Sequence, residues 1–283
     1  MKSPSNNSEL RRCRPLLGTF VEITATGPDE RRLHPAINAA FAVIEKIQKL
    51  MSAHDANSEL SRLNREAASY PVVVSRETFE VLRRADKLAA ESQGAFDPTI
   101  APVLASWRIL PARLERKRCG TWRDVRLLRG RKVYFRQPLA LDLGGIAKGY
   151  AVDRAIEKLR ESGVSEATVN AGGDLRAFGA QPFWVHLRHP ANPQMLAHKI
   201  PIQNAALATS SPCFTERTWR GRRVSHLVNS LRRTAVTGAV SVTVRTRECW
   251  LADALTKVVL NAPHNHAEAM LERHRAQATV LKV

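Results

Sequence analysis

The stretch Leu141-Asp142-Leu143-Gly144-Gly145-Ile146-Ala147-Lys148-Gly149-Tyr150-Ala151-Val152-Asp153 is the centre of our interpretation of this chain. The apolar run 139–143 predicts a buried strand, and the apolar spacing over 150–159 predicts a helix. Gly144 and Gly145 stand at the junction, where the absence of Cβ atoms lets a ligand approach the backbone closely. The N-terminus of the following helix and the ammonium group of Lys148 both favour a negative charge. The stretch therefore indicates an anionic ligand, most simply a phosphate.

A second interpretation treats the glycine pair as a plain turn with Lys148 in solvent. The pattern matches neither the P-loop nor the G-x-G-x-x-G dinucleotide motif. The ligand preferences of those two motifs therefore do not apply to this chain.

The chain is strongly basic. Among its 283 residues, Lys and Arg number 44 and Asp and Glu number 26, which gives a net charge of +18. Such a balance suits an anionic ligand, an acidic partner protein, nucleic acid or a membrane surface. Because the basic residues are scattered and match no nucleic-acid-binding motif, we expect no nucleic acid as a partner. No run of 18 apolar residues occurs, so we expect no membrane span.

The N-terminal segment carries neither an apolar secretory region nor the surroundings of a lipidated cysteine, since Cys13 follows Arg11-Arg12. Its polar composition predicts a disordered tail over residues 1–12, followed by a single domain over 13–283. The four cysteines form no C-x-x-C pair, which argues against zinc, and their wide spacing fits reduced thiols. We expect a cytoplasmic protein, and nothing in the sequence indicates its oligomeric state.

Strand and helix patterns are mixed along the chain without a regular βα repeat. Helical spacing predicts helices over 34–51, 58–64, 75–90, 150–161, 252–260 and 267–275. Strands are predicted over 16–26, 72–74, 125–128, 133–135, 139–143, 167–170, 175–179, 183–187, 206–209, 226–228, 239–244 and 279–283. This arrangement predicts an α+β fold with a largely antiparallel or mixed sheet.

Several short motifs follow one another in a recognisable order. They are residues 14–19, 51–64, 94–99, 141–153, 170–176, 208–210, 226 and 252–255. Together they resemble the ApbE family, the FAD:protein FMN transferases. The resemblance implies a T-fold-like α+β fold with mixed or antiparallel sheets flanked by helices, and a ligand cleft between two halves. It also implies an enzyme that cleaves FAD with the help of Mg²⁺, attaches FMN through a phosphoester bond to a Thr or Ser of a target flavoprotein, and releases AMP.

The resemblance assigns roles residue by residue. It implies that His226 is the catalytic base, and imidazole suits that role, although a lone histidine is also compatible with a structural role. It implies a metal site formed by Asp253 and the Ala147 backbone, with Thr256 and Lys257 at or beside a family threonine ligand. The implied cofactor-binding residues are His54, Phe96, Asp97, Gly144, Gly145, Lys148, Asn170, Gly172, Gly173, Asp174, Thr209 and Ser210.

Some of these residues also have structural interpretations. The segment 170–174 is compatible with a simple turn, and Thr209 and Ser210 with strand-end hydroxyls that bond the backbone. Asp253 is compatible with a carboxylate that stabilises a helix N-terminus, and Asp97 with turn chemistry.

The chain departs from the family pattern around the expected site. Lys257 stands at the threonine position, His54 replaces a tyrosine, Ser211-Pro212-Cys213 replaces Gly-Asp-Tyr, and Asn229-Ser230 replaces Asp-Pro. We hypothesise that the Lys257 ammonium partly replaces Mg²⁺, or that the helix shifts so that Thr256 serves. The departures leave two alternatives open: a catalytically impaired FAD-binding protein, and an FAD pyrophosphatase in which water replaces the acceptor hydroxyl.

Overall fold

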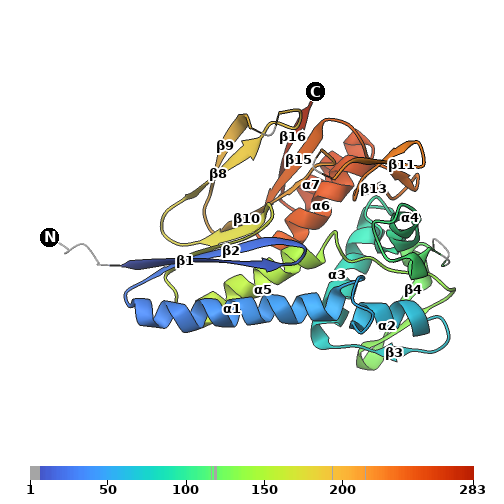
Figure 1. The fold of residues 1–283 in the computed structure, drawn as a ribbon, viewed down its shortest axis with the longest axis horizontal. Helices are drawn as coiled ribbons and strands as arrows, with labels where there is room; N and C mark the ends of the chain where they lie inside the picture. The colour runs from blue at the N-terminus through green and yellow to red at the C-terminus, as the bar shows by residue number, and fades with distance from the viewer. Residues whose placement is uncertain (1–6, 116, 118–119, 193, 214) are drawn as a thin grey trace.

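A seven-stranded sheet forms the centre of the computed structural model, which describes residues 7–115, 117, 120–192, 194–213 and 215–283 (Figure 1). Its order is β1-β2-β6-β7-β10-β15-β16, and neighbouring strands are antiparallel throughout. The strands are β1 Ser8–Leu16, β2 Thr19–Gly27, β6 Glu166–Ala171, β7 Asp174–Phe178, β10 Ala205–Ser210, β15 Val240–Thr246 and β16 Gln277–Lys282. The predicted α+β class with antiparallel sheets is confirmed.

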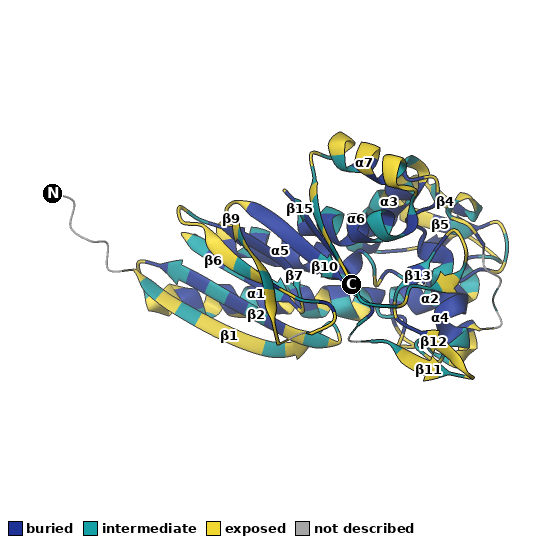
Figure 2. Cartoon of the chain, turned by 90° about the horizontal axis from the view of Figure 1, so that it is seen from above, coloured by how far each residue is buried: buried dark blue, intermediate teal, exposed yellow. Residues whose placement is uncertain are grey.

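Three helices cover one face of this sheet (Figure 1). They are α1 Glu30–Met51, α5 Ala147–Glu161 and α6 Cys249–Asn261, and α7 His264–Arg273 lies against α6 and β16. Helix α1 packs on α5 and on β1 and β2, α5 packs on β6 and β7, and α6 packs on β10 and β15. Their apolar sides join the inner face of the sheet in one continuous core, which Figure 2 shows as a band of buried residues.

Strand β1 corrects the predicted disordered tail. Residues 8–12 form a regular antiparallel ladder with β2, in which Arg12 lies opposite Ile23. The ladder satisfies the backbone groups, while Arg11 and Arg12 keep their side chains exposed to solvent. The polar composition of residues 8–12 therefore belongs to an edge strand, whose side chains face solvent, and does not indicate disorder. Residues 1–6 of the predicted tail lie outside the described part of the chain.

The segment 139–143 is buried and extended, as its apolar character predicts, but it is not the expected strand. The Asn64 side chain, and not a neighbouring strand, bonds the backbone N–H and C=O groups of Leu141. Its Nδ2 donates to the Leu141 carbonyl at 3.0 Å, and its Oδ1 accepts from the Leu141 N–H at 2.8 Å. The turn 144–146 follows, and α5 begins at Ala147 instead of the predicted Tyr150.

A second group of elements lies at one end of the helix layer (Figure 1). It comprises α2 Glu59–Glu66, α3 Arg76–Glu91, α4 Ala101–Ser106, and a sheet of order β3-β5-β4 made by β3 Val72–Val73, β4 Val125–Leu128 and β5 Lys132–Phe135. Ser58 and Ser75, the first residues of the helices predicted over 58–64 and 75–90, cap α2 and α3. Since one core cluster joins these elements to the central sheet, we propose that residues 13–283 form a single domain, to which β1 is added.

Three hairpins complete the described chain. They pair β8 Phe183–Arg188 with β9 Leu196–Ile202, β11 Arg217–Trp219 with β12 Arg222–Val224, and β13 Val228–Asn229 with β14 Thr234–Ala235. Leu187 and Ile202 of the first hairpin pack on Leu175 and Leu207, on the sheet face opposite the helices. The sequence did not indicate β9, because it carries few buried side chains and includes Pro201.

Two further predictions concerned membrane-spanning helices and the state of the cysteines. Within the described ranges, no helix has both the length and the apolar composition needed to cross a bilayer. Cys13, Cys213 and Cys249 are free thiols, and Cys119 lies outside the described residues.

Candidate active site

Four charged side chains from three elements, two buried aspartates and two partly exposed lysines, form a cluster beside the turn 144–146. Lys148 on α5 pairs with Asp174 at the start of β7, and its Nζ lies 3.7 Å from Asp253 Oδ2. Lys257 pairs with Asp253 Oδ1 from one turn further along α6. The side chains of Asp174 and Asp253 are only 4% and 0% exposed. We call these four residues the Lys–Asp cluster.

The charges of this cluster depend on one another. Burial opposes ionisation of Asp253, but the ammonium groups of Lys148 and Lys257 hold the pKa of its carboxyl below the usual value. Burial and the neighbouring Asp253 charge raise the pKa of Asp174. The two carboxylates in turn raise the pKa of Lys148 in spite of burial. The cluster therefore holds two cations and two carboxylates whose protonation is coupled.

A glycine inside α5 brings this helix into contact with α6. A Cβ atom on Gly149 would lie 2.4 Å from the Cys249 carbonyl oxygen and 2.7 Å from the Trp250 Cα. The Gly149 N–H donates to Asp253 Oδ2 at 3.3 Å. Gly149 was not among the predicted site residues. A glycine within a helical pattern was the available signal, because it costs helix stability unless close packing requires it.

A buried ion pair fixes the start of α6. Asp153 on α5 accepts from Arg176 on β7 at 2.7 Å, and from the N–H groups of Cys249 and Trp250 at 2.9 Å each. These contacts satisfy two of the unpaired N–H groups of the α6 N-terminus. Asp153 therefore positions the helix that carries Asp253.

The turn between β6 and β7 presents open backbone next to the cluster. Asn170 Oδ1 accepts from the Gly173 N–H at 3.0 Å, and Asp174 follows directly. Gly172 has φ +64° and a Cβ there would lie 2.5 Å from Thr19 Oγ1, whereas Gly173 has φ +102° with open space beside it. The positive φ angles favour glycine at both positions, and at Gly172 the Thr19 side chain leaves no space for a Cβ.

Thr209 and Ser210 point to opposite faces of β10. Ser210 Oγ lies on the helix side and bonds Thr256 Oγ1 at 2.6 Å, while Thr209 Oγ1 bonds Thr243 Oγ1 at 2.9 Å. Thr256 also donates to the Asp253 carbonyl at 2.7 Å. The structure thus brings Ser210 and Thr256 to the cluster side of the sheet and leaves Thr209 on the other face.

The loop 94–97 contributes a ring and a structural carboxylate. A Cβ on Gly145 would lie 3.3 Å from Lys257 Cε and 3.5 Å from Phe96 Cε2, so both side chains adjoin the glycine turn. Asp97 accepts from the Thr99 N–H at 2.8 Å and from Arg233 at 3.0 Å. The Asp97 carboxylate therefore holds the loop, and the Phe96 ring is the part of it that lies near the cluster.

His226 lies in the segment between β12 and β13 and is exposed. Partial burial and the nearby charges of Arg217 and His54 lower its pKa, which favours the neutral ring. Among the contacts of the described residues, none joins His226 directly to the Lys–Asp cluster. His54 is also near Asp142: burial raises the pKa of Asp142, while the charges of His54 and Lys148 lower it. Sequence reasoning did not select Arg217.

The residues that replace the family's Asp-Pro have local structural contacts. Asn229 Oδ1 accepts from the Arg232 N–H at 2.9 Å. Ser230 Oγ lies 2.7 Å from the carbonyl oxygens of both Gly94 and Ala95. Ser230 therefore ties the β13–β14 hairpin to the loop that carries Phe96.

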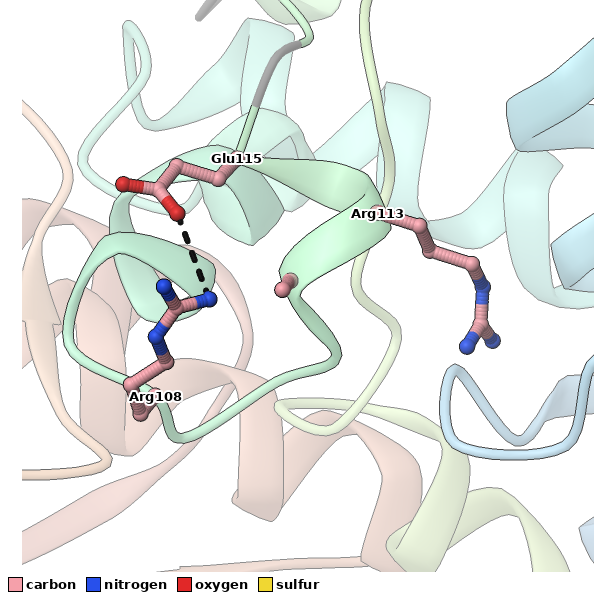
Figure 3. Close-up of a pocket in the computed structure, with 4 residues that line it drawn as sticks. Arg108, Arg113 and Glu115 are labelled. Atoms are coloured by element: carbon pink, nitrogen blue, oxygen red, sulfur yellow. Dashed lines mark ion pairs between the residues drawn. The ribbon is translucent and has the colours of Figure 1, made fainter.

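A cavity of about 710 Å³ lies apart from these residues and is lined by Arg108, Ala112, Arg113 and Glu115 (Figure 3). Arg108 pairs with Glu115 at 3.4 Å, whereas Arg113 extends the other way and donates to the Ala53 carbonyl at 2.7 Å. The Arg113 side chain therefore contacts the segment next to His54, and the predicted cleft between two halves stays a prediction.

The residues at the expected metal site do not fit Mg²⁺. This ion prefers octahedral oxygen ligands at about 2.1 Å and usually keeps several waters. Here both Asp253 oxygens face ammonium or N–H groups, and the Thr256 hydroxyl is bonded to Ser210 and to a helix carbonyl. Ala147 opens α5, so its carbonyl accepts a bond of the helix itself. Across the described ranges, no group of three or more His, Cys, Asp or Glu side chains is placed to bind a metal.

In the comparison with known proteins, the sequence model of the ApbE family matches residues 17–281. The chain belongs to the ApbE family. An FAD:protein FMN transferase of Vibrio cholerae is 28% identical over 82% of this chain and 75% of its own length. One of Klebsiella pneumoniae is 29% identical over 67% of this chain, which spans only 63% of that relative. The crystal structure of the ApbE protein of Thermotoga maritima superposes with a TM-score of 0.84 at 25% identity, covering 96% of this chain and 94% of that one.

Proposed function

We propose that this ApbE family member is an FAD:protein FMN transferase, which cleaves FAD and attaches FMN to a Thr or Ser hydroxyl of a target flavoprotein. The observation that carries the proposal is the Lys–Asp cluster at the Gly144-Gly145 turn. The cluster carries two ammonium groups, and the Phe96 ring adjoins the same turn. Cations suit a pyrophosphate and an aromatic ring suits stacking on a flavin, which supports the proposal. The FAD:protein FMN transferases of Vibrio cholerae and Klebsiella pneumoniae, to which the chain is similar, support the same reaction.

In the proposed reaction the acceptor hydroxyl oxygen attacks the phosphorus of the FMN half of FAD. A new P–O bond forms, the pyrophosphate P–O bond breaks, and AMP leaves with the electron pair. The hydroxyl proton passes to His226, whose lowered pKa keeps the ring neutral and able to accept it. The two lysines of the cluster would stabilise the charge that develops on the phosphate oxygens.

The acceptor and the location belong to the same proposal. The net charge of +18 favours an acidic segment around the acceptor residue. We propose no nucleic-acid partner, and a cytoplasmic location stays a prediction. The Mg²⁺ implied by the resemblance is not used in any step, because the donor atoms described above do not fit it.

The test is direct observation of the covalent adduct. The purified protein, FAD and a carrier with a threonine flavinylation segment are incubated, and the carrier is measured by intact-mass spectrometry. We expect a mass increase of one FMN unit together with equimolar AMP, both lost in His226→Ala and Asp253→Ala. His264→Ala is the matched control, since His264 is exposed on α7 and pairs only with Glu268 among the described residues.

Two other outcomes would contradict the transferase. Free FMN and AMP without an adduct would identify a pyrophosphatase in which water is the acceptor. Tight FAD retention without any AMP would identify a flavin-binding protein whose departures from the family pattern have removed catalysis.

A further inference from the structure

Lys257 occupies a position that is unusual for a surface lysine. Its side chain is 17% exposed, and its Nζ donates to both the carboxylate and the carbonyl oxygen of Asp253, the latter at 3.0 Å. The buried Asp253 carboxylate therefore has an ammonium group of its own helix on Oδ1, four residues away. The Asp253 carboxylate therefore has a cationic partner when no ligand is bound.

The second oxygen of Asp253 is also engaged. Oδ2 accepts the Gly149 N–H at 3.3 Å and lies 3.7 Å from Lys148 Nζ. Neither oxygen is thus available to a metal ion without displacing a cation or an N–H donor. Lys148 and Lys257 already supply two positive charges to Asp174 and Asp253, so a divalent ion would enter a site whose buried carboxylates have cationic partners.

Lys257 also faces the ligand side of the cluster. Its Cε lies 3.3 Å from the place where a Gly145 Cβ would stand, which puts the stem of the side chain against the glycine turn. An ammonium group has three donors, and two are used on Asp253 within the described residues. The remaining donor is available to a phosphate oxygen bound at this turn.

We propose that Lys257 serves as the cation of this site, so that FMN transfer by this chain is independent of divalent metal. The inference rests on the proposed transferase function for its catalytic part only. Asp253 then acts as the carboxylate that holds Lys257 and Lys148 in position, instead of acting as a metal ligand. A lysine carries a single charge on a covalent tether, which a chelator cannot remove.

The first experiment measures metal binding without reference to activity. Mn²⁺, a spectroscopic probe for Mg²⁺ sites, is titrated into the wild type, Lys257→Thr, and Lys257→Thr combined with Asp253→Asn, with free Mn²⁺ measured by electron paramagnetic resonance. We expect no Asp253-dependent site in the wild type, one Mn²⁺ per chain in Lys257→Thr, and loss of that ion in the double variant. One Mn²⁺ in the wild type that Asp253→Asn removes would overturn the proposal, and this result requires no variant at position 257 to fold.

The second experiment measures FMN transfer in EDTA and in Mg²⁺. We expect equal rates for the wild type in both, and a loss of at least tenfold for Lys257→Thr in EDTA that Mg²⁺ restores. Lys158→Thr is the matched control, because Lys158 is an exposed α5 lysine paired with Glu161. Wild-type transfer that EDTA abolishes and Mg²⁺ restores would overturn the proposal. Absence of transfer under every condition would refute the transferase itself, while the Mn²⁺ titration would still decide the cation.

Discussion

Replacing Gly149 by alanine tests whether contact between α5 and α6 shapes the site. The new Cβ would lie 2.4 Å from the Cys249 carbonyl oxygen and 2.6 Å from its carbonyl carbon. Normal contacts are about 3.5 Å, so one helix must move by about 1 Å. Because the opposing atoms belong to the backbone, rotamer changes do not relieve the clash.

Two effects of opposite sign decide the outcome. Overpacking of this kind costs about 1–3 kcal/mol, whereas alanine in place of glycine in a helix gains about 1 kcal/mol. We therefore expect Gly149→Ala to lower the free energy of unfolding by up to about 2 kcal/mol. The shift of Lys148 and Asp253 relative to each other should also lower the FMN transfer rate about tenfold or more, since catalysis is sensitive to misplacement on this scale.

Urea unfolding followed by tryptophan fluorescence and far-ultraviolet circular dichroism measures the change. Gly27→Ala is the control, because its Cβ would meet only the Leu33 side chain, at 3.2 Å, and no backbone atom, so we expect a smaller loss than for Gly149→Ala. A Gly149→Ala protein that is more stable than the wild type and transfers FMN at the wild-type rate would contradict the described approach of α5 to α6.

Three further predictions concern the residues around the cluster. The acid limb of the pH profile of kcat/KM should lie below pH 6.5, because the pKa of His226 is lowered. Arg217→Gln removes a positive neighbour of His226 and should move this limb to higher pH. An unmoved limb would exclude His226 as the titrating base. Ser230→Ala should cost about 1–3 kcal/mol in urea unfolding and increase hydrogen exchange in the loop 94–97, since two carbonyl contacts are lost; unchanged exchange would separate this serine from the loop. Ser210→Ala should raise KM for FAD, whereas Thr209→Val should not, because only Ser210 faces the helix side of β10; equal effects would contradict this orientation.

Elements with a strong local signal were predicted from the sequence. The amphipathic helices α1, α2 and α3 depend on residues a few positions apart, so the apolar spacing alone identified them. The alternating strands β2 and β15 were found for the same reason. The elements that failed depend on distant partners: β1 is a strand because β2 lies beside it, and 139–143 is not one because Asn64 bonds its backbone.

The candidate site shows the same limit. Lys148 and the glycines around it were selected from their own stretch, and Asp174 and Asp253 from the family resemblance. Their contacts could not be predicted, because Gly149 and Asp253 are separated by 104 positions and meet only through helix packing. The groups that face Asp253 Oδ2, the Gly149 N–H and the Lys148 ammonium, likewise reach it only because α5 packs on α6. No pattern of residue spacing in the sequence predicts that contact.

Strand β1 has a consequence for the behaviour of the protein at high concentration. It pairs with β2 on one side and is the last strand of the sheet on the other, so its outer backbone groups could template a strand of a second molecule. The strand carries Arg11, Arg12 and Arg14, with Pro15 near its end, and the proline has no N–H to donate. Like charges on two such edges would repel each other. The polarity of this segment therefore protects an open sheet edge against self-association, and a variant with neutral residues at these positions should aggregate at lower protein concentration.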